Sequence, residues 1–234
     1  MTKIVAVIPC YNEEEFIGSV VDWSIPMCTH VVVSDDNSVD KTATVALDSG
    51  AVVCYNPGYL HGAGAATRRG IELALRMGAD IVVTLDGDRQ HDPLDIEALV
   101  KPILDDEADI TVGSRFMTAP CELQSYRRLG IQVITQSLNI KSSVKFSDGQ
   151  CCFRAHRRNV LERIKITEDG FPFSVEMLIK ARKLGFRIMD IPVCVTYHTQ
   201  FEYNSSHNPV THGLHVLLGV VKWRAKVELL KSKI

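Results

Sequence analysis

The feature of the sequence that most constrains the fold is a short apolar run that ends abruptly in acidic residues. Residues 81–85 are all aliphatic or β-branched, which is typical of a strand buried on both faces. The triplet Asp86-Gly87-Asp88 follows at once, and Pro93 then begins a helical pattern for which Asp92 is a suitable N-cap. Two carboxylates at the end of a buried strand suit a divalent cation, Mg²⁺ or Mn²⁺, that is shared with substrate phosphates. The alternative is an ordinary turn, because Asp and Gly are common turn residues.

Strand-like and helical segments alternate through the first half of the chain. We expect strands at residues 3–9, 31–34, 51–54, 81–85 and 109–112, and helices at 41–49, 62–77 and 94–104. Ser38 is the expected cap of the helix at 41–49. This alternation predicts a single α/β domain, in which a mostly parallel central sheet is flanked by helices.

Acidic residues directly follow two of these strands. Asp35 and Asp36 end the second strand, the Asp86-Gly87-Asp88 triplet ends the fourth, and a polar loop follows Pro9 at the end of the first. The carboxyl ends of parallel strands lie at one edge of a sheet, and ligands bind there in sheets of this type. The convergence favours a binding site over unrelated turns.

Composition excludes several classes of protein. The formal net charge of −2 over 234 residues argues against a nucleic-acid-binding protein. The seven cysteines include no C-x-x-C pair and follow no secretory signal, which favours reduced thiols in a cytosolic setting. No apolar stretch approaches the roughly 18 residues that a membrane span needs. We therefore expect a protein that is soluble or lies on a surface.

The second half of the chain is less regular. Residues 114–125 contain Pro120 and show no clear period, so we expect a mobile loop over the site. Helices are expected at 126–140, 156–166 and 173–184 and a strand at 187–195, and the polar stretch 197–209 is expected to be flexible.

Some polar residues in this pattern need a partner or a function. Glu176 lies within an apolar helical pattern, where a carboxylate is costly unless it is hydrogen-bonded, and Arg154 is a candidate structural partner. Asp148 and Glu176 are both candidates to line the floor of the site. His91, beside the acidic triplet, is expected to support the metal ligands from behind or to cap a helix.

The final segment, 211–234, is expected to be a basic amphipathic helix. Its apolar residues include Leu214, Leu217, Leu218, Val221 and Trp223, and five cations stand against the single acid Glu228: Lys222, Arg224, Lys226, Lys231 and Lys233. A helix of this kind can lie in the plane of an anionic membrane surface. The alternative is a terminal helix packed on the core. The one-sided charge favours the membrane, so we divide the chain into a catalytic domain at 1–209 and a membrane-surface tail at 210–234.

Motifs between Ile8 and about Val195 carry a resemblance to a known family. They read IPCYNEE, SDDNSVDKT, HGAGAATRRGIELA, LDGDRQHDP, VGSRF, YRRLG, DGQCCFRA and FSVEMLIKARKLGF. In this order and spacing, the sequence resembles the inverting glycosyltransferases of family 2, which have the GT-A fold. Within the family it is most similar to the polyprenyl-phosphate sugar synthases, such as the dolichyl-phosphate mannose synthases.

The resemblance implies a donor and a cofactor. The donor is a GDP- or UDP-linked sugar, and the cofactor is Mg²⁺ or Mn²⁺. Residues that match the family's donor site fall into two groups. Those that match the nucleoside cradle are Pro9, Tyr11 and Glu13, with Asp36 at the position that reads the base. Those that match the metal site are Asp86 and Asp88, with Asp88 the more direct ligand and Gln90 as a neighbour.

The resemblance also implies a polyprenyl or dolichyl phosphate acceptor at the cytosolic face of a membrane. Arg115, Arg127 and Arg128 match basic residues that hold its phosphate. The chain departs from the family at Gly62-Ala63-Gly64, which lacks a Lys between the glycines, and at Cys151-Cys152, which replaces Ser-Gly. A third departure is Ile131, which replaces a serine.

The acceptor decides whether the reaction needs a base. A phosphate monoester is already largely a dianion at neutral pH, so it needs cations such as Arg115 and no proton abstraction. A sugar hydroxyl would need a general base, for which Asp148 is the best candidate.

The expected catalytic residues are Asp88 at the metal site, Arg115 for a phosphate acceptor and Asp148 for a hydroxyl acceptor. A non-catalytic sugar-nucleotide-binding subunit is the alternative from another class. A dinucleotide-binding dehydrogenase fits poorly, because Thr67 stands where the third glycine is required.

Overall fold

The computed structural model describes residues 1–117, 123–196 and 209–231. The centre of the loop predicted at 114–125 and all but the last residue of the stretch predicted at 197–209 lie outside the described residues.

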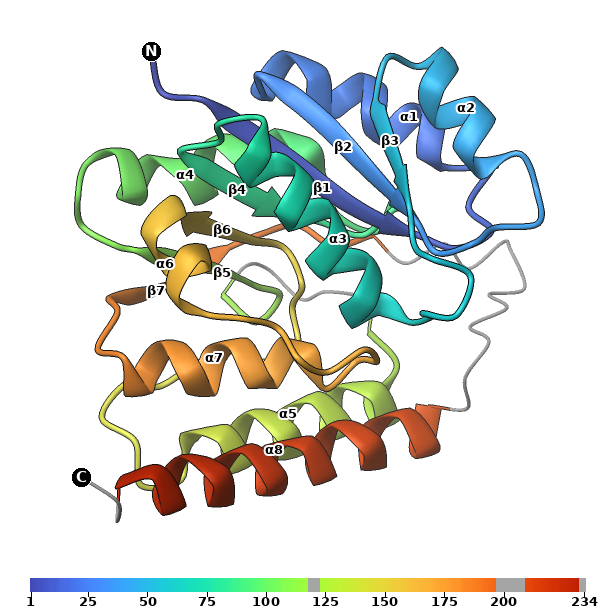
Figure 1. Cartoon of the computed structure of the whole chain (residues 1–234). Coiled ribbons are helices and arrows are strands. Elements are labelled where there is room, and N and C mark those ends of the chain that lie inside the picture. The colour runs from blue at the N-terminus through green and yellow to red at the C-terminus, as the bar shows by residue number, and fades with distance from the viewer. Residues whose placement is uncertain (118–122, 197–208, 232–234) are drawn as a thin grey trace.

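The described residues form one α/β domain around a seven-stranded sheet (Figure 1). In the order β3-β2-β1-β4-β6-β5-β7, its strands are Val52–Tyr55, His30–Asp35, Ile4–Cys10, Ile81–Thr84, Arg154–Arg157, Ile110–Ser114 and Ile188–Pro192. Neighbouring strands are parallel, except that β6 runs antiparallel to both β4 and β5. The prediction of a mostly parallel sheet is confirmed.

Helices cover both faces of the sheet. They are α1 (Ile17–Ser24), η1 (Ile25–Met27), α2 (Thr42–Asp48), α3 (Ala63–Arg76), η2 (Pro93–Asp95), α4 (Ile96–Leu104), α5 (Ser125–Asn139), α6 (Arg158–Arg163), α7 (Phe173–Lys183) and α8 (Pro209–Lys231). No helix among the described residues is long and apolar enough to cross a membrane.

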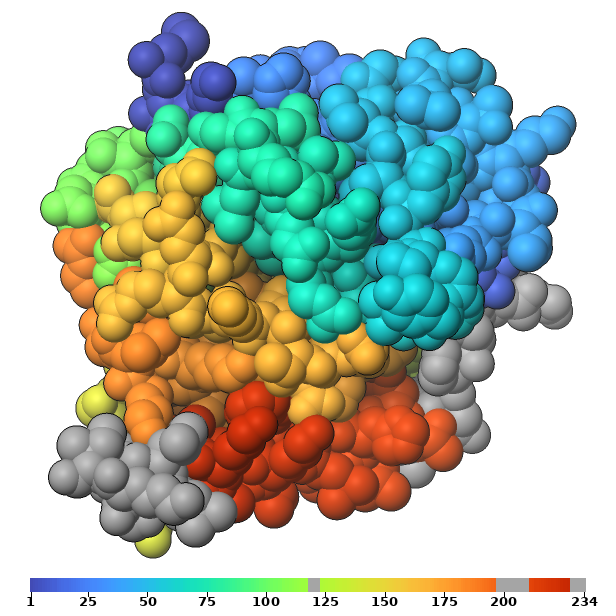
Figure 2. Space-filling view, in the orientation of Figure 1, coloured from blue at the N-terminus to red at the C-terminus, as the bar shows by residue number. Residues whose placement is uncertain are grey.

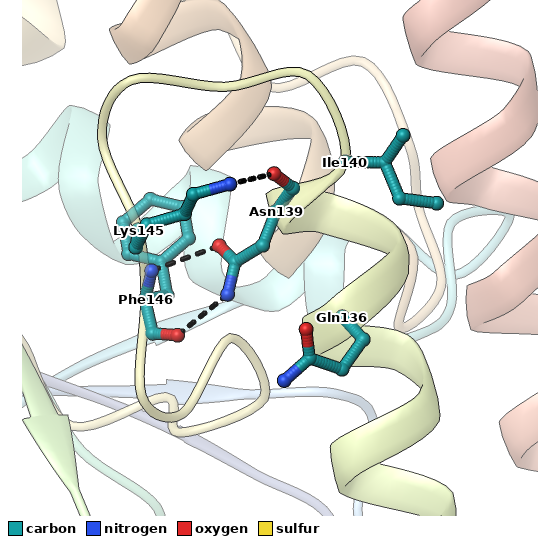
Figure 3. Close-up of a pocket in the computed structure, with 5 residues that line it drawn as sticks. All are labelled: Gln136, Asn139, Ile140, Lys145 and Phe146. Atoms are coloured by element: carbon teal, nitrogen blue, oxygen red, sulfur yellow. Dashed lines mark hydrogen bonds between the residues drawn. The ribbon is translucent and has the colours of Figure 1, made fainter.

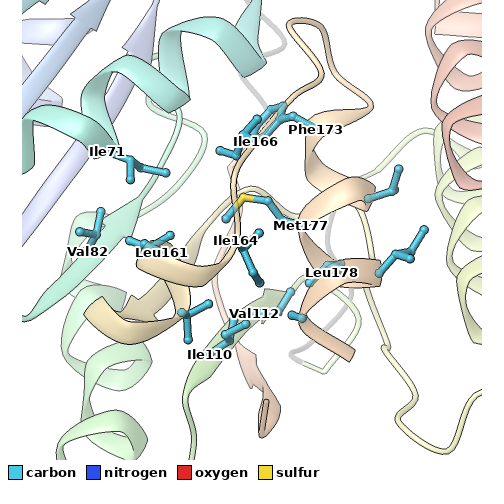
Figure 4. Close-up of a cluster of buried hydrophobic side chains, with 14 of the residues drawn as sticks. Ile71, Val82, Ile110, Val112, Leu161, Ile164, Ile166, Phe173, Met177 and Leu178 are labelled. Carbon is cyan, nitrogen blue, oxygen red and sulfur yellow. The ribbon is translucent and has the colours of Figure 1, made fainter. Parts of the chain in front are cut away.

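The strands divide the core into two layers because successive side chains point to opposite faces. In β1, Val5 and Val7 join a cluster with residues of α3, α6, α7 and α8, whereas Ala6 and Ile8 join one with α1, α2 and α4. Figure 4 shows part of the first cluster, in which side chains of α6 and α7 pack beside those of β4 and β5. Burial on both faces explains why β1 and β4 read as nearly continuous apolar runs.

The strand β6 was not predicted, and the helix predicted at 156–166 is wrong at its start. His156 and Arg157 belong to β6, and α6 begins only at Arg158. The strand reads Arg-Ala-His-Arg, yet Arg154 and His156 are only 2% and 1% exposed. Burial lowers the pKa of His156 to about 3, so the ring is neutral at pH 7. Tertiary pairing between β4 and β5 overrides the polar composition of this segment.

The helix caps agree with the predictions in one case and differ in another. Asp92 accepts a hydrogen bond from the Leu94 backbone N–H at 3.0 Å, as predicted. Ser38 does not cap α2: its hydroxyl donates to Asp35 and accepts from the Asn12 N–H. The carboxylate of Asp40 accepts the Thr42 N–H instead, at 2.9 Å. Ser38 therefore joins the loops that follow β1 and β2.

The terminal helix α8 packs on α5 and α7 at one side of the molecule (Figures 1 and 2). Trp223 is only 3% exposed, and its indole N–H donates to Glu168 at 2.8 Å. This residue therefore belongs to the core, in agreement with the packing alternative. Leu214, Leu218 and Val221 of the same helix are more than half exposed. The boundary between 1–209 and 210–234 stays a prediction.

Two helical glycines make a matched test of the packing of α3 on the sheet. A Cβ at Gly70 would lie 2.4 Å from Val7 Cγ1, whereas a Cβ at Gly130 of α5 would meet nothing within 4 Å. We expect Gly70→Ala to destabilise the protein by about 2 kcal/mol, because overpacking exceeds the gain in helix propensity. Gly130→Ala should stabilise it by up to about 1 kcal/mol. Urea unfolding measures both, and equal stability of Gly70→Ala and the unchanged protein would contradict this packing.

Candidate active site

Three acidic segments meet at the carboxyl edge of the sheet, because β1 pairs in parallel with β2 on one side and with β4 on the other. The loop after β1 carries Glu13, and the ends of β2 and β4 carry Asp36 and Asp86. Hydrogen bonds join the loops: the Asp36 N–H donates to the Cys10 carbonyl at 2.8 Å, and the Glu13 N–H donates to the Thr42 hydroxyl at 2.7 Å. The ends of the first, second and fourth predicted strands therefore lie at one edge of the sheet, as predicted from the sequence.

Two carboxyl groups at this edge have raised pKa values. Burial, followed by the charges of Asp88 and Asp86, raises the pKa of Glu13 to about 8. Burial also raises the pKa of Asp86 to about 6, although the charges of Arg115 and Arg154 lower it. Glu13 is thus held near like charges, and such an arrangement is suited to a cation.

The acidic triplet is shaped by its glycine and by His91. A Cβ at Gly87 would lie 2.6 Å from Cys10 Sγ, so only glycine lets this turn pack against β1. His91 is 6% exposed, and burial lowers its pKa to about 4. The neutral ring can accept the Asp86 N–H at Nδ1, 3.4 Å away, and its Nε2 lies 3.8 Å from Cys151 Sγ. His91 thus holds the turn that bears Asp86, as the sequence predicts.

The residues of the triplet fit a hard divalent cation. Gln90 orients the Asp88 carboxylate through its backbone N–H at 3.0 Å and its side-chain amide at 2.8 Å. Asp86 and Asp88 offer carboxylate oxygens, which Mg²⁺ and Mn²⁺ prefer. Within the described parts of the chain, no cluster of three or more acidic, His or Cys side chains could hold a metal. Mg²⁺ is commonly bound through one or two protein carboxylates together with substrate phosphates, and Asp86 and Asp88 are suited to that type of site.

Asp36 connects three elements at the predicted nucleoside pocket. Its carboxylate accepts the Gly62 N–H at 2.7 Å and the Asn56 side-chain amide at 2.6 Å. Asn56 directly follows β3 and was not identified from the sequence; its only signal there is a polar residue two positions after the strand predicted at 51–54. Pro9 and the half-exposed Tyr11 lie at the end of β1 on this edge, and their role in a nucleoside cradle stays a prediction.

Arg115 and Asp148 form a buried ion pair beside the acidic triplet. Arg115 Nε lies 2.6 Å from Asp148 Oδ2, and a terminal nitrogen lies 2.8 Å from Oδ1. The Asp148 side chain is fully buried, and its Oδ1 also accepts the Gln150 N–H. Both carboxylate oxygens are thus engaged in orienting a guanidinium at the end of β5. This arrangement fits a positioning role for Asp148 better than the predicted role as a base.

The other predicted arginines lie in the first turn of α5. The Arg128 guanidinium lies 5.7 Å from the centre of the Phe116 ring, and Phe116 directly follows Arg115. The Arg127 guanidinium contacts the Tyr126 hydroxyl at 3.3 Å. The structure therefore brings Arg128 to the vicinity of Arg115 through Phe116.

An open groove along α5 was not predicted. It consists of two adjoining depressions of about 390 and 440 Å³, which share Gln136 and Phe146. The first is also lined by Phe116, Gln132, Thr135 and Ser147, and the second by Asn139, Ile140 and Lys145. Figure 3 shows Asn139 fixing the backbone of Phe146 at the second depression. Since Phe116 and Ser147 adjoin Arg115 and Asp148 in the chain, the groove begins beside the ion pair.

The predicted pairing of Glu176 with Arg154 is wrong. The fully buried Glu176 carboxylate accepts hydrogen bonds from the backbone of Thr167 and Glu168 and pairs with Lys180 at 2.5 Å. Arg154 instead donates to the backbone carbonyls of Cys151, Gly149 and Ser174. Glu176 and Arg154 have different partners because a buried polar group forms hydrogen bonds with the polar groups that lie nearest to it in the fold, and these include backbone groups.

Comparisons with known proteins agree with this geometry. The family model described as "Glycosyl transferase family 2" matches residues 5–165. The chain belongs to glycosyl transferase family 2. It is 30% identical over 212 residues to the polyprenol monophosphomannose synthase of Mycolicibacterium smegmatis, with 83% of this chain and 77% of that protein covered.

The name of a second relative also refers to a lipid phosphate, dolichyl phosphate. The chain is 28% identical over 241 residues to the UDP-N-acetylglucosamine–dolichyl-phosphate N-acetylglucosaminyltransferase of Methanococcus voltae, with 92% of this chain and 91% of that protein covered. The predictions of a family 2 glycosyltransferase, and of a resemblance to the polyprenyl-phosphate sugar synthases, are confirmed.

Solved structures confirm the predicted fold. The glucosyl-3-phosphoglycerate synthase of Mycobacterium tuberculosis, in complex with Mn²⁺, UDP and glucosyl-3-phosphoglycerate, matches 95% of this chain and 80% of its own with a TM-score of 0.73 and 21% identity. A further structure of that enzyme, in complex with Mg²⁺ and UDP, has a TM-score of 0.71. At this identity the likeness shows the fold, a single GT-A-type domain.

Substitutions at the triplet test the metal site. We expect Asp88→Asn to abolish Mn²⁺-dependent nucleotide binding, because a neutral amide replaces a ligand. Gln90→Ala should weaken Mn²⁺ about tenfold, because it frees the carboxylate that Gln90 orients. Calorimetric titration of Mn²⁺ with UDP or GDP present measures both, with Asp105→Asn, an exposed carboxylate, as control. Mn²⁺ binding to Asp88→Asn at the affinity of the unchanged protein would contradict the assignment.

Proposed function

We propose that this chain is a metal-dependent inverting glycosyltransferase that moves a sugar from a UDP- or GDP-sugar to a polyprenyl phosphate at the cytosolic face of a membrane. The observation that carries the proposal is the Arg115–Asp148 pair beside the acidic triplet, which offers an oriented cation at the place where a hydroxyl acceptor would need a base. The names of two relatives, a polyprenol monophosphomannose synthase and a dolichyl-phosphate N-acetylglucosaminyltransferase, support this acceptor class.

The donor binds at the carboxyl edge of β1, β2 and β4. Pro9, Tyr11 and Glu13 hold the nucleoside, and Asp36 recognises the base. Asp88 and Asp86 hold Mg²⁺ or Mn²⁺, and the Mn²⁺ and Mg²⁺ complexes of the M. tuberculosis enzyme support this cofactor. When bound, the cation neutralises the charge that develops on the leaving diphosphate. Gln90 fixes the Asp88 carboxylate for this purpose.

The acceptor binds to the arginines that directly follow β5 and that lie in the first turn of α5. An oxygen of the acceptor phosphate forms a bond to the anomeric carbon as the bond from that carbon to the diphosphate breaks on the opposite face. The attacking oxygen carries no proton at neutral pH, so no base is required. Arg115, Arg127 and Arg128 hold the phosphate through guanidinium hydrogen bonds, and Asp148 keeps Arg115 in place.

Exposed apolar side chains support a peripheral contact with the membrane. Tyr126, Leu129 and Val133 recur along α5 at helical spacing, Ile140 follows the helix directly, and each is at least 47% exposed. Leu214, Leu218 and Val221 form a similar row on α8. The two helices that carry these rows lie side by side (Figure 1). Such rows, with the basic residues of α8, suit an anionic lipid surface.

Transfer of labelled sugar tests the proposal. The experiment offers a panel of UDP- and GDP-sugars to a short polyprenyl phosphate, with Mn²⁺ or with a chelator, and uses the matched polyprenol as control acceptor. We expect product in the lipid phase only with Mn²⁺ and only with the phosphorylated acceptor. Arg128→Ala should raise the acceptor KM at least about tenfold and leave the donor KM unchanged, because it removes a charge-assisted contact to the phosphate.

Other outcomes decide between the alternatives. Transfer to a hydroxyl acceptor, lost in Asp148→Asn while donor binding persists, would replace the polyprenyl phosphate by a hydroxyl and make Asp148 a base. Tight metal-dependent nucleotide binding without turnover of any donor would instead indicate a non-catalytic binding subunit.

A further inference from the structure

The glycine-rich start of α3, which donates to Asp36, is held from the other side by a turn at residues 167–172. The Ala65 N–H donates to the Asp169 carbonyl at 3.0 Å, and Arg68 pairs with the Asp169 carboxylate at 2.6 Å. A Cβ at Gly62 would lie 2.5 Å from the Asp169 carbonyl oxygen, and a Cβ at Gly64 would lie 2.2 Å from that of Glu168. The turn therefore lies in direct backbone contact with the donor-site loop.

The turn is anchored below by Glu176 of α7. The carboxylate accepts the backbone N–H groups of Thr167 and Glu168 and the Thr167 hydroxyl, at 2.7 to 3.0 Å. Because Glu176 is fully buried and also pairs with Lys180, its position is fixed by packing and by charge. The backbone of the turn is thus rigidly placed at its first residues.

The terminal helix α8 contacts the same turn at three places. His212 meets the Phe171 ring edge-on, with the ring centres 4.3 Å apart. Gly219 lies so close to Pro172 that an added Cβ would come within 2.7 Å of it. Glu168 Oε1 accepts the Trp223 indole N–H at 2.8 Å and pairs with Lys222 at 2.6 Å.

These contacts form one continuous chain from α8 to the nucleoside pocket. Trp223 and Lys222 donate to the Glu168 carboxylate. In the same turn, the Asp169 carbonyl accepts the Ala65 N–H, and at the start of α3 the Gly62 N–H donates to Asp36. Each link is a hydrogen bond or a backbone contact, and the groups at its two ends are buried: Trp223 is 3% exposed and Asp36 is 9% exposed. A shift of the turn would therefore displace the Gly62 N–H that orients Asp36.

We propose that Glu168 is a positioning residue for the nucleotide-sugar donor, held in place by α8, so that the terminal helix is a structural part of the donor site. The assignment of the pocket to a donor rests on the function proposed above. Glu168 acts through the backbone of its turn and through Gly62, and it does not contact the donor itself. Loosening α8 from Glu168 weakens donor binding and leaves the reacting groups at Asp88 and Arg115 in place.

The test uses Trp223→Phe, which removes the indole donor and keeps an aromatic ring, and Lys222→Ala, at a side chain that is 59% exposed. Lys101→Ala is the matched control, because it removes a Lys–carboxylate pair of the same 2.6 Å length on α4. Glu168→Ala removes both contacts, and Glu168→Gln keeps an acceptor for Trp223. Thermal unfolding of each variant checks that it is folded.

Two measurements are made on each variant. Hydrogen exchange of the Ala65 amide, without any ligand, reports the contact between the turn and α3. We expect it to be about tenfold faster in Trp223→Phe and Glu168→Ala, unchanged in Lys101→Ala and partly restored in Glu168→Gln. In the transfer assay, the donor KM should rise about tenfold in Glu168→Ala, with kcat within about twofold of the unchanged enzyme.

The two readouts separate the possible failures. Unchanged Ala65 exchange in Trp223→Phe and Glu168→Ala overturns the coupling. Faster exchange with an unchanged donor KM overturns the positioning role of Glu168. If the unchanged protein binds neither UDP nor GDP with Mn²⁺, the function proposed above fails, and the role of Glu168 toward a donor fails with it. The exchange measurement then still decides whether α8 holds the start of α3.

Discussion

Parallel pairing of β1 with β2 on one side and with β4 on the other is the constraint on which the site depends. It forces the ends of three buried strands to one edge, and the chain places acidic residues at or just beyond each end. Burial, and after it the charges of Asp88 and Asp86, raise the pKa of Glu13 to about 8. A bound divalent cation would offset the repulsion among these carboxylates, in keeping with the metal–diphosphate complex proposed above.

Beside the acidic edge, the site contains a guanidinium that is held by a carboxylate. The antiparallel strand β6 enters between β4 and β5, and the segment before it carries Asp148 to the end of β5, where it holds Arg115. A buried ion pair is weak evidence for stability, but here it fixes the direction of a guanidinium. A leaving diphosphate at the acidic edge and an acceptor phosphate at the arginines would place two anions on either side of the transferred sugar. Separate cationic partners for the two anions keep their mutual repulsion low.

The parts of this arrangement that follow local rules could be predicted from the sequence. The strands β1, β2 and β4 were recognised because burial on both faces leaves β-branched runs, and Asp92 was recognised because its cap is made within its own turn. Features that depend on distant partners could not. The strand β6 reads as polar, Glu176 bonds to the backbone of Thr167, and Trp223 reaches Glu168 across 55 positions of the chain. In each case a buried polar group was satisfied by a segment whose proximity only the fold determines.

A crystal structure of the protein soaked with Mn²⁺ and UDP, or with Mn²⁺ and GDP, would test the central claim most directly. The account predicts an anomalous manganese peak within about 2.5 Å of an Asp88 carboxylate oxygen and of the diphosphate, with the base beside Asp36. Manganese at another place, or a nucleotide bound away from the carboxyl ends of β1, β2 and β4, would contradict it.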